Sequence, residues 1–331
     1  MKKILMILAG LAMLLMLVGC GGGDKKPEKQ QAAPKAEKKI SIAYQYGLAY
    51  APAVIAKEQG LIEKNYKELT GENVKVEWVQ MASGANINTG MTSGDLDVGF
   101  MGLAPAITGI SKGLNYKIFT NLSGQVHGMM SNDPSIHTLK DLVGTKKQIA
   151  LVNIGSFQHL ILAKALADNG IDAHALDSNI VAMKHPDGMA SLESGSLPCH
   201  LTSSPYIFME QKNSKLHEIS EVKNSWTSKD SFIVGIASKR LHDDTKLYTA
   251  VCKALAEGVN YINNNNEKCA ELMAKYDKNS VDVELQYIKN GYYSVKTSKL
   301  LDMAKFMAAN KFIKAAPKDF RTLTYDNVEG D

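Results

Sequence analysis

The chain has 331 residues, of which 45% are hydrophobic and 22% charged, a composition that excludes disordered, collagenous and coiled-coil proteins. Because single hydrophobic cores stop growing at roughly 250–300 residues, we expect two lobes. The net charge of +4 arises near the start of the chain: from Ile40 onward 30 basic and 31 acidic groups remain, so we expect no nucleic-acid partner.

The first twenty residues have the pattern of a secreted lipoprotein. Met1-Lys2-Lys3 is positively charged, and residues 4–18 are almost uninterruptedly apolar. This stretch is shorter than the ~20 residues that span a membrane and has the length of a secretory signal. It ends in Leu17-Val18-Gly19-Cys20, which resembles a bacterial lipobox, so we expect a signal peptide at 1–19 and lipidation (palmitate among the acyl chains) at Cys20. The alternative is an uncleaved anchor with an incidental cysteine.

Residues 20–39 are rich in Gly, Lys, Glu, Gln, Pro and Ala and contain almost no bulky apolar residue. Such a segment cannot form a core and is typical of a flexible tether. We therefore expect a globular body held by its lipid anchor at the extracytoplasmic face of a membrane of the cell envelope. Three further cysteines follow at positions 199, 252 and 269. The sequence leaves open whether Cys252 and Cys269 form a disulfide.

The body alternates short apolar segments with helical patterns. Strands are predicted at 40–44, 74–79, 97–101, 117–122, 148–152, 179–183 and 232–237. Helices are predicted at 52–60, 83–94, 104–113, 157–169, 188–194 and 205–211. This order indicates α/β sheets with helices on both faces.

The tail has a different pattern. Residues 243–309 are predicted to be almost wholly helical, with an interruption at 263–266. One apolar stripe consists of Leu247, Val251, Ala254, Leu255, Val259 and Ile262. A stripe at this spacing must be buried, so we expect the tail helices to wrap the first lobe.

Four ordered stretches resemble one known family. They are AYAPA and KEQGL within 49–61, SGDLDVG and GLAPA within 93–106, LKDLVG at 139–144, and GS at 155–156. Together they resemble the solute-binding lipoproteins of the nitrate, sulfonate and taurine class of ABC importers, a group that includes pyrimidine-precursor binders of thiamine synthesis. The sequence departs from that family at SLPCH (196–200), where the family has an acidic pair followed by Ala.

The resemblance implies a type II periplasmic-binding fold: two α/β lobes joined by a hinge that the chain crosses twice, with a helical C-terminal segment packed on lobe one. We expect lobe one at 40–125 and 235–331, lobe two at 126–234, and the crossings near 123–130 and 231–236. The implied function is capture of a small organic solute, sulfonate- or taurine-like or pyrimidine-precursor-like, by hinge closure. The implied partners are an ABC permease and ATPase.

Ligands of open α/β sheets lie beyond the carboxyl ends of strands, where helices begin. The first-lobe candidates at such positions are Tyr46 and Tyr50, which can stack on a planar ligand, and Ser83 and Gly102 at helix starts, whose free backbone N–H groups can hold an anion. The alternative for the tyrosines is packing, and for Ser83 a plain N-cap.

The second-lobe candidates are Ser156, Phe157 and Tyr206 at two further helix starts, together with His127 in the expected hinge. Ser156 could cap its helix and contact ligand, and the two aromatic rings could cover an apolar part of it. His127 could equally be a surface histidine. The chain has only two arginines, Arg240 and Arg321, and neither is a cleft candidate, which favours a weakly charged or heteroaromatic solute over nitrate.

Motifs for catalysis and metal binding are missing from the sequence. The eight histidines and few cysteines have no ligand spacing, and there is no nucleophile elbow, Walker loop or dinucleotide fingerprint. We expect a monomeric binding protein without cofactor or metal. The alternative is a lipoprotein of the same fold with a sensory role or a metabolic one, such as a pyrimidine-synthesising enzyme.

Overall fold

The computed structural model describes residues 38–223 and 225–331. The predicted signal peptide, Cys20 and nearly all of the predicted tether lie outside the described residues. The first strand begins at Lys38, two residues inside the stretch predicted as tether.

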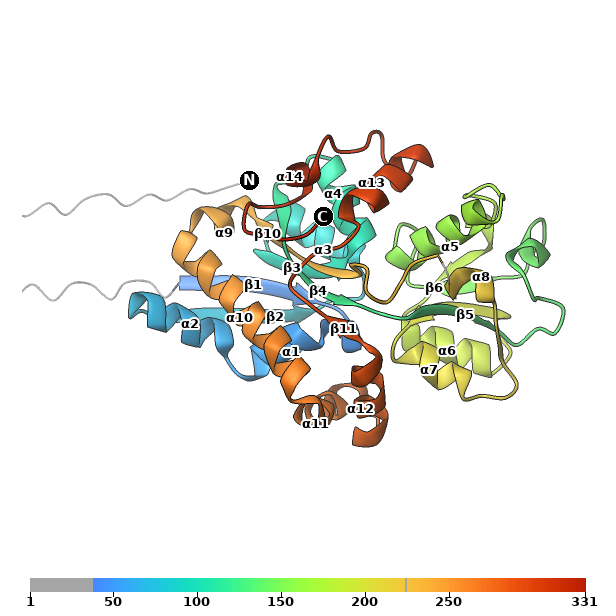
Figure 1. Cartoon of the computed structure of the whole chain (residues 1–331), viewed down its shortest axis with the longest axis horizontal. Helices are drawn as coiled ribbons and strands as arrows, with labels where there is room; N and C mark the ends of the chain where they lie inside the picture. Colours follow the sequence, from blue (N-terminus) through green and yellow to red (C-terminus); the bar gives the residue numbers. More distant parts are fainter. Residues whose placement is uncertain (1–37, 224) are drawn as a thin grey trace, which may run out of the picture. The chain divides into compact units, whose positions relative to one another are not determined.

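The first sheet has six strands in the order β11-β4-β10-β3-β1-β2 (Figure 1). The strands are β1 (Lys38–Tyr44), β2 (Val74–Gln80), β3 (Val98–Gly102), β4 (Tyr116–Gly124), β10 (Ile233–Ser238) and β11 (Tyr292–Tyr293). β1 runs parallel to β2 and β3, whereas β10 pairs antiparallel with β3 and β4. Residues of β3 are all buried, as expected for a strand covered on both faces.

Helices follow the strands of this sheet. They are η1 (Leu48–Tyr50), α1 (Ala51–Glu58), α2 (Leu61–Thr70), α3 (Gly84–Ser93) and α4 (Leu103–Ser111). The predicted helix at 52–60 is thus confirmed, but α2 directly after it was not predicted. Gly60 separates the two helices with a left-handed backbone (φ 58°), which a glycine adopts without steric cost.

The second sheet has five strands in the order β7-β6-β8-β5-β9. They are β5 (His127–Ser131), β6 (Ile149–Leu151), β7 (Ile180–Ala182), β8 (Cys199–Ser203) and β9 (His217–Glu218). Its helices are η2 (Leu139–Leu142), α5 (Phe157–Asp168), η3 (Asp177–Asn179), α6 (His185–Glu193), α7 (Tyr206–Gln211) and α8 (Ser220–Lys223). The sheet is mixed: β6 pairs parallel with β7 and β8, and β5 pairs antiparallel with β8 and β9.

The C-terminal part is mainly helical, as predicted. It contains α9 (Lys239–Asp243), α10 (Thr245–Asn264), α11 (Asn266–Asp277), α12 (Val281–Asn290), α13 (Leu300–Ala309) and α14 (Phe320–Leu323). The predicted apolar stripe lies on α10, which packs along α1 and α2 of the first lobe (Figure 1). The exception is β11, which adds an edge strand to the first sheet within the stretch predicted to be helical.

The chain passes between the two sheets twice. β4 ends in the first sheet at Gly124 and β5 begins in the second at His127, and the return runs from α8 to β10. The two passages lie side by side, because a Cβ added to Gly124 would stand 2.2 Å from the backbone oxygen of Ser228. The division into lobes at 40–125 with 235–331 and at 126–234 stays a prediction, with which this membership of the strands is compatible.

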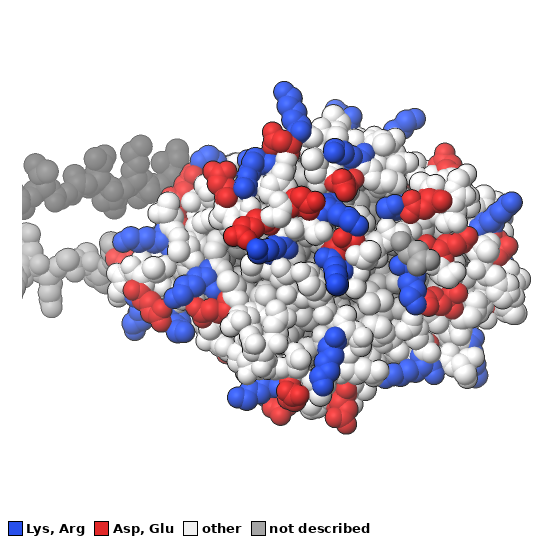
Figure 2. All heavy atoms as spheres, in the orientation of Figure 1, with Lys and Arg blue, Asp and Glu red and all other residues white. Residues whose placement is uncertain are grey.

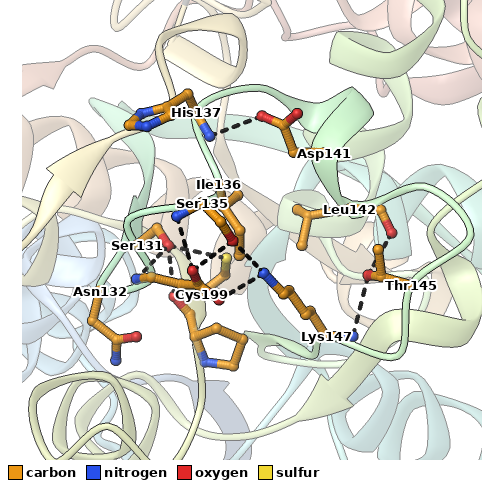
Figure 3. A network of polar contacts seen from close by, with 12 residues as sticks. Ser131, Asn132, Ser135, Ile136, His137, Asp141, Leu142, Thr145, Lys147 and Cys199 are labelled. Carbon is orange, nitrogen blue, oxygen red and sulfur yellow. Dashed lines mark hydrogen bonds and ion pairs between the residues drawn. The ribbon is translucent and has the colours of Figure 1, made fainter.

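Polar contacts fold the segment between β5 and β6 back onto the second sheet (Figure 3). Lys147 Nζ donates to Ser135 Oγ at 2.5 Å and forms an ion pair with Asp133 at 2.7 Å. Asp141 accepts hydrogen bonds from the backbone N–H of His137 and from Thr138. These contacts are structural and lie apart from the cavity described below.

Cys199, Cys252 and Cys269 are free thiols, so the disulfide that the sequence left open is not formed. Arg240 donates two hydrogen bonds to Asp97 Oδ1, at 3.0 and 2.6 Å, and so fixes α9 to the start of β3. Over the face drawn in Figure 2, acidic and basic side chains are interspersed. Among the described residues, no helix is both long and apolar enough to cross a bilayer.

Candidate functional site

A cavity lies where the loops of the two sheets meet. Its wall on the first lobe consists of Gln45, Tyr46, Ala49, Tyr50, Ala82, Gly84, Gly102 and Pro105, and Phe232 joins it from the return passage between the lobes. Its wall on the second lobe consists of Val152, Asn153, Ser156, Phe157, Gln158, Lys184, His185, Ser203 and Ser204. The cavity has a free volume of about 40 Å³, which is room for only a few waters. A larger solute therefore requires the lobes to separate or the side chains to move.

The turn after β1 brings both predicted tyrosines to the cavity. Tyr50 is 5% exposed, and burial raises the pKa of its hydroxyl, so it stays neutral. Tyr46 is 40% exposed and stands at the mouth. Ser123 at the end of β4 holds this turn in place by donating a hydrogen bond to the carbonyl oxygen of Ala49 at 2.8 Å.

Four helices begin at the cavity, one of which, α6, is described below. Gly84 is the first residue of α3, Gly102 precedes α4, and Ser156 caps α5 by accepting a hydrogen bond from the N–H of His159. The starts of α4 and α5 approach closely across the lobes, because a Cβ added to Gly102 would lie 3.1 Å from Cβ of Phe157. The free N–H groups of a helix start carry partial positive charge and suit a negatively charged or hydrogen-bond-accepting ligand group.

His127, predicted to contact ligand, lies behind the cavity wall. His127 is 2% exposed. Its ring packs edge-on against Phe232, with centroids 4.4 Å apart, and at a tilt against Phe157, with centroids 5.3 Å apart; both phenylalanines line the cavity. Burial, with a smaller contribution from His185, lowers the pKa of His127 to about 3, so the ring is neutral. The structure thus gives His127 a packing position and places it outside the cavity lining.

Ser83 and Tyr206 also lie next to the lining without belonging to it. Ser83 Oγ accepts the N–H of Asn86 and donates to its Oδ1, and so acts as the N-cap of α3. Tyr206 stacks on His185, with ring centroids 5.4 Å apart and an interplanar angle of 24°. Whether either side chain contacts a solute stays a prediction.

Lys184 and His185 are the main lining residues that the sequence analysis missed. They stand at the start of α6, directly after β7, and Pro186 in the first turn is a signal that could have placed this start. Within the part of the chain that the structure describes, Lys184 is the only lining residue with a charged side chain. Burial and the nearby His200 lower the pKa of His185 to about 3, so its ring is neutral, and its Nδ1 lies 2.9 Å from Thr202 Oγ1.

The buried side chains of His200 and Glu210 form a pair that packs against α6. His200 Nδ1 lies 2.5 Å from Glu210 Oε1, and both side chains are fully buried. Burial lowers the pKa of His200 to about 3 and raises that of Glu210 to about 9, so both are neutral and the carboxyl group donates to the ring. His200 packs under Gly188 of α6, where an added Cβ would lie 2.6 Å from Nε2. The departure from the family pattern at 196–200 thus supplies a support for the cavity wall.

Further contacts join the two lobes around the cavity. The Lys184 Nζ lies 5.8 Å from the ring centroid of Tyr46 at the mouth. On one side of the cavity, the ring of Phe208 stacks on that of Tyr287, with centroids 5.5 Å apart. On the other side His174 lies 2.7 Å from the carbonyl oxygen of Asn310. Within the described residues, no group of three or more His, Cys, Asp or Glu is placed to hold a metal ion.

Two α/β lobes with a cavity between them define the periplasmic-binding fold, and solved structures agree. The alkanesulfonate-binding protein SsuA from Xanthomonas axonopodis pv. citri, bound to MOPS, is 17% identical and aligns with a TM-score of 0.70 over 90% of this chain and 100% of its own. The nitrate-binding protein NrtA from Synechocystis PCC 6803 is 14% identical, with a TM-score of 0.66 over 87% of this chain and 84% of its own. A Candida albicans protein described as having the generic periplasmic binding protein fold is 14% identical, with a TM-score of 0.70 over 88% of this chain and 97% of its own.

The sequence identifies the family. Residues 33–276 match the NMT1-like family, and the chain belongs to it. A curated relative, the nitrate import ATP-binding protein NrtC of Synechocystis sp., is 23% identical in an alignment of 258 positions that covers 73% of this chain. The match spans 38% of the length of that relative.

Proposed function

We propose that the chain is the solute-binding component of an ABC importer, and that it captures a small organic solute in the cavity between its lobes. The observation that carries this proposal is the cavity itself: both lobes contribute to its wall, and four helix starts border it. Membership of the NMT1-like family supports the same function.

Hinge closure is the mechanism that we propose. Contacts from both lobes to one solute exist together only when the lobes meet, so the solute shifts the population toward the closed form. The small free volume of the cavity supports this order of events, because a solute must enter while the lobes are apart. The paired passages near Gly124 and Ser228 are the segments that would bend.

The solute is proposed to be sulfonate- or taurine-like, or pyrimidine-precursor-like. Tyr46, Phe157 and Phe232 offer aromatic surface for an organic part, and Ser156 and Ser203 offer hydroxyls. Two of the similar structures are named as alkanesulfonate- and nitrate-binding proteins, which supports a solute of this size class. We propose that the solute leaves the cavity chemically unchanged and passes to a permease driven by an ATPase.

We also propose that the mature protein is a monomer anchored by lipid at Cys20, on the extracytoplasmic face of a membrane. The support is the sequence of the first twenty residues. Growth with a labelled fatty acid should label the wild type and leave Cys20→Ala unlabelled and released from membranes. Equal labelling of both proteins would contradict the anchor without affecting the binding function.

A thermal-shift screen of the purified chain tests the binding function, since a ligand that binds only the folded state raises the melting temperature. The screen should contain sulfonates, nitrate, carboxylates and pyrimidines. At least one class should raise the melting temperature, and mass spectrometry should recover that compound unchanged. Conversion of the compound to a product would contradict a role in binding alone.

A further inference from the structure

The charge of the cavity wall rests on one side chain. Among the described residues, Lys184 is the only lysine, arginine, aspartate or glutamate in the lining. In the described part of the chain it has no carboxylate partner. Its Nζ lies over the ring of Tyr46, 5.8 Å from the ring centroid. The cavity therefore presents one positive charge that the protein itself does not neutralise.

Polar groups beside Lys184 have free hydrogen-bonding capacity. Ser204 lines the cavity, is 2% exposed, and its hydroxyl has no partner in the described structure. A buried hydroxyl without a partner costs about 1–3 kcal/mol, which a ligand acceptor would relieve. His185 has Nδ1 within hydrogen-bond distance of Thr202, which leaves Nε2 of this cavity-lining ring for a ligand.

We infer that Lys184 selects the solute by charge: the solute is a small organic acid with a single negative charge, which lies between Lys184 and the hydroxyl of Ser204. This inference rests on the proposed function and names its substrate class. One unneutralised cation matches one negative charge, and the start of α6, a helix of nine residues, adds partial positive charge at the same place. A neutral pyrimidine precursor would leave Lys184 without a counter-charge.

The position of Lys184 adds a second consequence. Because it stands on the second lobe and contacts Tyr46 on the first, an anion bound beside it is covered when the lobes meet. Lys184 is itself exposed at the mouth, so its replacement should leave the fold intact. The matched control is Lys140, an exposed lysine of the same lobe that does not line the cavity.

The experiment compares wild type, Lys184→Gln, Lys184→Arg and Lys140→Gln. Each purified protein is titrated with acids beside their uncharged amides: propanesulfonate with propanesulfonamide, benzenesulfonate with benzenesulfonamide, and nicotinate with nicotinamide. Each is also incubated with a small-metabolite extract, and the bound compounds are identified by mass spectrometry. We expect wild type and Lys140→Gln to bind only acids, Lys184→Gln to bind them about tenfold more weakly or not at all, and Lys184→Arg to retain part of the affinity.

Two results would overturn the inference and leave the proposed function standing: equal binding of an amide and its acid, or unchanged acid affinity in Lys184→Gln. Capture of a neutral or cationic metabolite by wild type would do the same. If no variant retained any compound from the pairs or the extract, the proposed function itself would fail and the inference with it.

Discussion

The contact between His174 and Asn310 predicts that closure depends on pH. His174 Nδ1 lies 2.8 Å from Asp177 Oδ2, and Nε2 lies 2.7 Å from the carbonyl oxygen of Asn310 on the other lobe. Both partners accept only, so both ring nitrogens must donate, which only the protonated ring can do. In agreement, the carbonyl of Asn310 and then the carboxylate of Asp177 raise the pKa of His174.

The other groups around His174 do not reverse the upward shift of its pKa. Phe312 packs on its ring at 4.5 Å, and Asp172 adds a further negative charge that raises its pKa. His159 contacts the same Asp177, but burial lowers the pKa of His159 and its Nδ1 accepts the N–H of Gly155, so its ring is neutral.

The direction of the pH dependence follows from the raised pKa of His174. The His174 contact is fully present below the ordinary histidine value of about 6.5 and is lost as pH rises through the raised pKa. A neutral ring keeps one donor and gives up one of the two bonds. A charged hydrogen bond contributes about 1.5–3 kcal/mol, but the side chain is 39% exposed, so screening reduces this to about 1 kcal/mol. The closed population should therefore fall about fivefold relative to the open one.

Fluorophores on the two lobes would report closure by energy transfer between pH 5.5 and 8.5. His174→Gln should remove most of the pH dependence, and His137→Gln, an exposed histidine of the same lobe, should leave it unchanged. An NMR titration should place the pKa of His174 above 6.5. A value at or below 6.5, or the same pH profile in wild type and His174→Gln, would refute the reasoning.

Three further predictions concern the core and the cavity. Glu210→Gln should flatten the loss of unfolding free energy between about pH 4.5 and 9, because the buried carboxyl, with its pKa raised to about 9, holds a proton that the unfolded chain releases. The same pH dependence of urea unfolding in wild type and variant would contradict this. Ser156→Trp should abolish ligand-induced thermal stabilisation and cost about 1 kcal/mol for the lost cap, whereas Ser156→Thr should bind. Gly258→Val should lower unfolding free energy by about 1–3 kcal/mol, since an added Cβ lies 2.4 Å from the backbone oxygen of Pro52; an unchanged urea midpoint would contradict that close approach.

The sequence predicted the strands whose residues are mainly apolar and missed those that bury polar side chains. β5 and β8 are buried throughout, but His127, His200 and Thr202 interrupt any apolar run. Tertiary partners make these polar residues tolerable: Thr202 pairs with His185, and His200 with Glu210. Such partners are distant in the sequence, so no local pattern could predict them.

The same reason limits what could be predicted of the cavity. Helix starts after strands are readable from sequence, and Tyr46, Tyr50, Gly102, Ser156 and Phe157 do line the cavity; whether they bind a solute stays a prediction. The direction of a side chain within a turn is set by packing. Thus Ser83 caps its helix and Tyr206 stacks behind His185.

The two lobes contribute different chemistry to the cavity. Family-like stretches at 49–61 and 93–106 supply Ala49, Tyr50, Gly102 and Pro105 to the first-lobe wall, including the start of α4. The second lobe supplies Lys184, His185 and Ser204, and the residues beneath them include the departure from the family pattern at 196–200. Backbone and small residues bind many anions alike, whereas a single lysine and a partnerless hydroxyl discriminate by charge and shape. We therefore expect the second lobe to discriminate among solutes, and replacements at Lys184 to change which solute is bound before they change whether the lobes close.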